Sequence, residues 1–150
     1  MDSERGHTIF IYDKIKVFFK HTDYHGFVHP YNFLEWMSYA REAFFKNVLP
    51  TYQLESNRSI NMVTVRMECD YLADARFGDD IEILIFTEHV KRFSFDVVFE
   101  FYRRPSQELL GIGRQTIAFL QSETAKPSSI PEGLYIEIKK GERKGVARYG

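Results

Sequence analysis

The chain has 150 residues, enough for one domain with a substantial core and too few for two. Its 20 basic and 21 acidic residues nearly cancel, so the charge gives no reason to expect nucleic acid or an anionic membrane as the main partner. The single cysteine, Cys69, excludes an internal disulfide and fits a reducing compartment. No apolar run has the length of a signal core or a membrane span, so we expect a soluble, cytoplasmic protein.

Hydrophobic periodicity predicts one long helix among several strands. Residues 9–19 alternate apolar and polar side chains and are predicted to form the first strand. A polar loop then leads into a helix that runs to about Val48, because Pro50 cannot continue it. Alternating apolar residues between turn signals predict four further strands, at 63–71, 81–90, 93–103 and 109–120.

This order of elements predicts an α+β fold in which a strongly curved antiparallel sheet surrounds the helix. We expect residues 1–125 to form this single domain and residues 126–150 to form a polar and basic tail. Within the tail, residues 134–138 are expected to be a short strand or a contact with a partner. The basic end from residue 139 is expected to be disordered, with docking to an acidic carrier surface as the functional alternative.

The helix is apolar around well over half of its circumference, so other structure should wrap it. Arg41 falls in the middle of the apolar arc. A buried guanidinium needs an anionic partner or several acceptors, since an unpaired buried charge costs several kcal/mol. Arg41 therefore either reaches an edge or a structural carboxylate, or lines a site and holds a substrate anion or a catalytic acid.

The loop before the helix holds the other candidate residues. Asp23 lies there among three of the five histidines, His21, His25 and His29. Asn32 is the predicted N-cap of the helix. A helix start presents unpaired N–H groups and a positive potential, which suit a developing oxyanion. A carboxylate beside it can attack an acyl carbon or activate the water that does so.

Two segments of the chain resemble the 4-hydroxybenzoyl-CoA thioesterase family of hotdog-fold proteins. One is the loop TDYHGFV at 22–28 with the later Asn32–Phe33 and Ala40–Arg41–Glu42, and the other is YLADARFGD at 71–79. The resemblance spans roughly residues 9–121. It implies a five-stranded antiparallel sheet wrapped around one long central helix, in a homodimer or homotetramer with active sites at the subunit interface. The implied activity is hydrolysis of an acyl thioester on coenzyme A or an acyl carrier protein, without a metal or redox cofactor.

In this resemblance Asp23 matches the family's catalytic carboxylate, which acts as nucleophile or as general base. The helix pattern from Trp36 to Phe44 is also similar to thioesterases that release polyketide chains in enediyne pathways. Those enzymes place an amide at the position of Asp23, and their arginine at the position of Arg41 contributes to the site. Fatty acyl, aromatic acyl and polyketide chains are therefore all candidate substrates.

One position departs from the family pattern. Family members commonly use a backbone N–H near the position of Pro30 as the oxyanion donor, and proline has none. The donor would then come from Tyr31, from His29 or from a shifted loop. The resemblance thus assigns catalysis to Asp23 and Arg41, and substrate or oxyanion binding to Tyr24, His29, Tyr31 and Asn32.

Other interpretations stay open. The three loop histidines have the spacing of a helical zinc site, but Gly26 and Pro30 interrupt the segment. Glu35 is an alternative carboxylate on the helix, although it shares the polar face with Glu42 and so favours a solvated role. Cys69 is predicted to be a small core residue and not a nucleophile. The protein as a whole could also be a hotdog dehydratase or isomerase on a carrier-bound thioester, or a non-catalytic acyl-binding protein.

Overall fold

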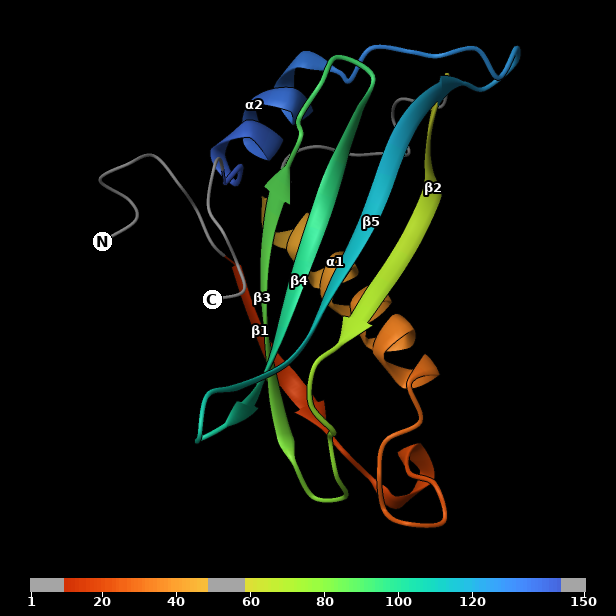
Figure 1. Ribbon diagram of the computed structural model, residues 1–150. Coiled ribbons are helices and arrows are strands. Elements are labelled where there is room, and N and C mark those ends of the chain that lie inside the picture. Colours follow the sequence, from red (N-terminus) through yellow and green to blue (C-terminus); the bar gives the residue numbers. More distant parts are fainter. Residues whose placement is uncertain (1–9, 49–58, 144–150) are drawn as a thin grey trace.

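The protein, seen in a computed structural model, is described for residues 10–48 and 59–143 (Figure 1). Five strands form one antiparallel sheet in the order β1-β3-β4-β5-β2, and helix α1 lies along one face of it. The expected α+β fold, a five-stranded antiparallel sheet around one long helix, is confirmed. The elements are β1 Phe10–Lys16, the 3-10 turn η2 Phe19–His21, α1 Tyr31–Val48, β2 Ile60–Tyr71, β3 Asp80–Glu88, β4 Ser94–Arg104, β5 Glu108–Gln121 and α2 Glu132–Lys140.

Helix α1 packs on the sheet because its apolar arc meets the inner faces of the strands. The ring of Phe33 lies edge-on to that of Phe101, with centroids 4.9 Å apart. Met37 is fully buried above Gly113 of β5. A Cβ added at Gly113 would lie 2.6 Å from the sulfur of Met37, so a side chain there would force the end of Met37 to move.

Strand β4 is buried on both faces, although the sequence predicted one apolar face and one more polar face. On the outer face, away from α1, Asp96 and Glu100 are only 8% and 4% exposed. Arg114 of β5 donates to Asp96 and to Glu88, in each case at 2.8 Å, and the guanidinium of Arg143 lies 3.6 Å from the Glu100 carboxylate. Paired charges with long side chains therefore cover a face that the sequence pattern marks as solvent-exposed.

The segment 134–138 is part of helix α2, so the prediction of a short strand there is wrong. Leu134 and Ile138 are fully buried because their spacing puts both on the helix face that meets the domain core. Thr87 of β3 donates its hydroxyl to the carbonyl of Ile138 at 2.8 Å. Residues 144–150, part of the end expected to be disordered, lie outside the described residues. Neither helix in the described part of the chain is long and apolar enough to cross a membrane.

Candidate active site

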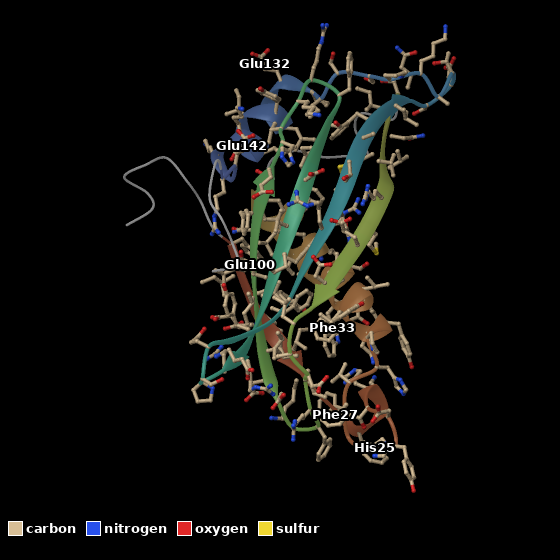
Figure 2. The ribbon with its side chains drawn as sticks, viewed as in Figure 1. His25, Phe27, Phe33, Glu100, Glu132 and Glu142 are labelled. Carbon is tan, nitrogen blue, oxygen red and sulfur yellow. The ribbon has the colours of Figure 1, made fainter. Side chains whose placement is uncertain are left out.

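Residues 21–29 form a closed loop at the end of the sheet opposite α2, where Figure 2 labels His25 and Phe27. The two ends of this loop are joined, since the N–H of His29 donates to the carbonyl of His21 at 3.0 Å. The chain therefore returns on itself just before α1, and Asp23 is held in the loop that precedes the helix start.

The carboxylate of Asp23 is oriented by the backbone of its own loop. Its Oδ1 accepts the N–H groups of Phe27 at 3.0 Å and His25 at 2.8 Å. These hydrogen bonds, above all that from Phe27, lower the pKa of Asp23 below its ordinary value. Among the described residues, Oδ2 receives no hydrogen bond. The loop thus presents an ionised carboxylate with one oxygen fixed and the other available for chemistry.

Helix α1 begins at Tyr31, directly after Pro30, so the prediction that Asn32 is the N-cap is wrong. An N-cap side chain accepts an N–H from the helix, whereas the amide of Asn32 donates to the carbonyls of His21 at 2.9 Å and His29 at 3.1 Å. Pro30 can stand at the helix entrance because its missing N–H would have had no helical partner there. Asn32, only 5% exposed, ties the helix start to both ends of the loop.

The backbone N–H groups around the helix start are mostly occupied. Those of His29, Asn32 and Phe33 each donate to a backbone carbonyl at 3.0 Å. Pro30 has no N–H. The N–H of Tyr31 donates to no residue in the ranges that the structure describes. Of the donors considered from the sequence, Tyr31 is the one whose N–H is available.

The two candidate tyrosines face outward in the single chain. Tyr24 is 97% exposed and Tyr31 is 63% exposed. The loop histidines are also separated, because each lies against a different aromatic ring: His21 against Trp36, His25 against Tyr24 and His29 against Tyr31. Within the described residues, no three side chains of the metal-binding types converge on one point.

Arg41 lies well away from the loop along α1. It is ten residues after Tyr31, which places it about 15 Å further along the helix axis. One guanidinium nitrogen donates to the hydroxyl of Thr64 at 2.6 Å and to the side-chain oxygen of Gln115 at 3.0 Å. Burial lowers the pKa of Arg41. In the described part of the chain its hydrogen bonds go to these two neutral acceptors, and none of its contacts is with Asp23.

Gln115 is a site candidate that the sequence reasoning missed. It is fully buried on the inner face of β5, and its Nε2 has no hydrogen-bond partner among the described residues. The side-chain oxygen of Gln115 accepts a hydrogen bond from Arg41, so the two residues form a polar pair inside an otherwise apolar layer. The available signal was the position of this amide between Gly113 and Ile117 on a strand face that should have been apolar.

Residues 17–138 match the Thioesterase-like superfamily over more than half of the chain. The chain belongs to this superfamily. As a member of this superfamily, the protein is an enzyme that hydrolyses thioester bonds. No functionally curated protein matches the sequence.

Solved structures show which fold this thioesterase-like chain shares. A 1,4-dihydroxy-2-naphthoyl-CoA thioesterase from Synechocystis has a TM-score of 0.78 at 19% identity, covering 88% of this chain and 96% of that one. The dynemicin thioesterase has a TM-score of 0.76 at 21% identity, covering 91% and 98%. A hypothetical protein from Staphylococcus aureus in complex with CoA has a TM-score of 0.81 at 12% identity, covering 95% and 90%. At these identities the likeness establishes the hotdog fold.

Proposed function

We propose that this protein hydrolyses acyl thioesters of coenzyme A or of an acyl carrier protein, with Asp23 as the catalytic carboxylate. The observation that carries the proposal is the state of Asp23: its pKa is lowered, one oxygen is fixed by backbone N–H groups, and the other has no partner among the described residues. Coenzyme A is supported as the carrier by the solved structures of the same fold, which include naphthoyl-CoA and gentisyl-CoA thioesterases and a CoA complex.

Asp23 can act by either of two routes. As a general base it takes a proton from water, the water oxygen bonds to the thioester carbonyl carbon, and the carbon–sulfur bond then breaks. As a nucleophile it bonds to the carbonyl carbon itself, the thiolate leaves, and water cleaves the resulting anhydride. Both routes release a free acid and a free thiol. Both also require an ionised carboxylate, which the lowered pKa of Asp23 favours at neutral pH.

The oxyanion that forms at the carbonyl needs a donor, and we assign this role to the backbone N–H of Tyr31. It is the N–H at the helix start without an acceptor in the described ranges, and the positive end of the helix dipole adds to its effect. Asn32 acts as a positioning residue, since its two hydrogen bonds hold the helix start against the loop. This assignment does not need a backbone N–H at Pro30, the position near which the family that the sequence resembles has its oxyanion donor.

We further propose that two copies of the chain join along β2 into a homodimer, alone or as half of a tetramer. Strand β2 is a 12-residue edge strand that pairs with β5 among the described strands. Its apolar residues Val65 and Met67 are 59% and 40% exposed. A long edge strand with exposed apolar residues favours pairing with another chain. The second chain would then enclose a substrate at Asp23, which is partly buried in one chain, and at Tyr24, which is exposed.

Arg41 and Gln115 are proposed to contact the acyl group of a substrate enclosed between the two chains. Arg41 contacts Thr64 of β2, so it lies toward the proposed interface and away from the β1 edge. A guanidinium and a buried amide suit an acyl chain that carries oxygen atoms, such as a hydroxylated aromatic acid or a polyketide, better than a saturated fatty chain. The free Cys69 is consistent with a cytoplasmic setting for such an enzyme.

The test is thiol release from a panel of acyl-CoA and acyl-carrier thioesters, by the wild type and by Asp23→Ala. The matched control is Asp74→Ala, which removes an exposed carboxylate from the 71–79 loop. Circular dichroism and thermal melting would show that both variants fold. We expect release by the wild type and the control, with loss in Asp23→Ala. A folded Asp23→Ala variant with full activity would contradict the mechanism, and no release from any donor would favour a dehydratase or a binding protein.

A further inference from the structure

A cavity lies at the β1 edge of the sheet, opposite the β2 edge proposed for dimerisation. It is a groove with a volume of about 470 Å³ between β1, the turn that follows it and the first turns of α1. We call it the β1–α1 groove. Its lining combines positive charge with aromatic rings and consists of Tyr12, Lys14, Ile15, Lys16, Phe18, Lys20, His21, Tyr31, Asn32, Glu35, Trp36 and Tyr39.

The positive charge of the groove comes from three lysines. Lys14 and Lys16 both line the groove, since side chains two residues apart in a strand lie on the same side of it. Lys16 is paired with Asp80 at 3.2 Å. Lys14 and Lys20 have no acidic partner among the residues that the structure describes. Two lysines are therefore available to an anionic ligand.

The aromatic rings of the groove remain accessible. Phe18 and Tyr39 are 55% and 46% exposed, although large aromatic side chains normally bury most of their surface. Trp36 forms the floor of the groove and is 2% exposed. Open rings beside lysines are the combination that binds a planar base together with its phosphates, because the rings stack and the ammonium groups neutralise.

One carboxylate, that of Glu35, also lines the groove, and it accepts the hydroxyl of Tyr39 at 2.8 Å. Such an acceptor would repel a phosphate placed next to it. It would instead suit the amino group of a base or the hydroxyl of a ribose. The groove therefore offers lysines from β1 and η2 and an acceptor from α1, which match the two ends of a nucleotide.

We propose that the β1–α1 groove binds the nucleotide end of coenzyme A, an adenine ring and ribose that carry phosphate groups. The inference rests on the proposed function to the extent that a CoA thioester is the substrate. A saturated acyl chain fits the groove poorly, since it would desolvate the lysines without pairing them. The volume is that of a small-molecule site, which favours a nucleotide over the surface of a carrier protein. His21 and Asn32 place the groove directly beside the Asp23 loop.

Binding can be measured without turnover, because Trp36 is the only tryptophan of the chain. The wild type is titrated with adenosine 3′,5′-bisphosphate, with adenosine and with inorganic phosphate while tryptophan fluorescence is followed. We expect saturable binding of the bisphosphate that weakens with salt, and much weaker binding of the other two probes. In the double variant Lys14→Gln/Lys20→Gln, we expect affinity for the bisphosphate to fall about tenfold, as expected for two partly exposed charge contacts.

The control is Lys126→Gln/Lys140→Gln, which removes two lysines outside the groove lining. Equal affinity in wild type and the Lys14/Lys20 variant, or equal binding of inorganic phosphate and bisphosphate, would overturn the proposal. If an acidic carrier protein binds the groove and the bisphosphate does not, the proposal is also overturned. Failure of hydrolysis leaves this titration intact, so the two proposals are tested separately. Where hydrolysis occurs, the variant should raise KM for an acyl-CoA and leave KM for the matching N-acetylcysteamine thioester unchanged.

Discussion

The hydroxyl of Tyr71, at the end of β2, donates a hydrogen bond to the carbonyl of Pro30 at 3.1 Å. The ring of Tyr71 also lies edge-on to Phe33, with centroids 5.4 Å apart. Burial raises the pKa of Tyr71 to about 12, so the hydroxyl remains a donor throughout the neutral range. A strand that is distant in sequence therefore holds the entrance of α1, where the proposed oxyanion donor lies.

Tyr71→Phe should separate this positioning effect from general stability. We expect the free energy of unfolding to fall by about 1 kcal/mol, the typical loss for one hydrogen bond, and kcat to fall by about fivefold with KM little changed. Urea denaturation and steady-state kinetics would measure both. The control is Tyr102→Phe, which removes a hydrogen bond of 2.9 Å to Glu100 on the outer face. An equal loss of kcat in the two variants would argue against a positioning role for Tyr71.

The proposed dimer predicts that a charge at Met67, an exposed apolar residue of the edge strand β2, keeps the chains apart. Met67→Glu should shift the protein from dimer to monomer in size-exclusion chromatography with light scattering, because a carboxylate cannot be buried there without a partner. Thiol release should fall with dimer content if the site lies between subunits. Ile11→Glu is the matched control, since Ile11 is 51% exposed on the opposite edge strand. A Met67→Glu protein that remains dimeric would place the interface elsewhere.

Cys69 is predicted to be dispensable for catalysis. Burial raises the pKa of its thiol to about 11, so the reactive thiolate is scarce at neutral pH. We expect Cys69→Ala to retain thioesterase activity, and the native wild type to react with iodoacetamide much more slowly than the urea-unfolded protein. Loss of activity in Cys69→Ala with an unchanged melting temperature would show that the thiol takes part in the chemistry.

The central features of the fold were accessible from the sequence because they are local. Helix α1 and the strands follow from periodicity, and the position of Arg41 within the apolar arc already required acceptors around it. The structure provides Thr64 and Gln115 as those acceptors, from two different strands. Their identity depends on strand register, which a single sequence does not state.

The errors concern residues whose role depends on distant partners. Asn32 has the chemistry of an N-cap, but the carbonyls of His21 and His29 lie within reach and its amide donates to them instead. Helix α2 was missed because its short apolar segment, residues 134–138, also fits a strand. Two of them, Leu134 and Ile138, suffice once the sheet end is present to cover them.

The outer face of the sheet depends on a cluster of charges around Asp96. This carboxylate accepts hydrogen bonds from Arg114 at 2.8 Å and from Thr116 at 2.8 Å, and it contacts His89 at 2.9 Å. Burial alone would raise the pKa of Asp96, but these partners outweigh it and lower the pKa below its ordinary value of 3.8. Arg114 is shared with Glu88, so the cluster joins β3, β4 and β5.

The lowered pKa of Asp96 predicts how stability depends on pH. A carboxyl group with a lower pKa in the folded state stabilises the fold at pH values above its unfolded pKa, and this contribution is lost as pH falls through the folded pKa. Asp96→Asn should therefore cost about 1–3 kcal/mol at pH 7, as expected for hydrogen bonds to a charged group, and less below pH 3.8. Urea denaturation of both proteins across this range would measure the difference.

Asp80→Asn is the control. It removes an exposed ion pair with Lys16 and should change the free energy of unfolding by less than about 1 kcal/mol. A deficit in Asp96→Asn that stays constant from pH 7 to pH 3 would show that the charge of Asp96 contributes nothing.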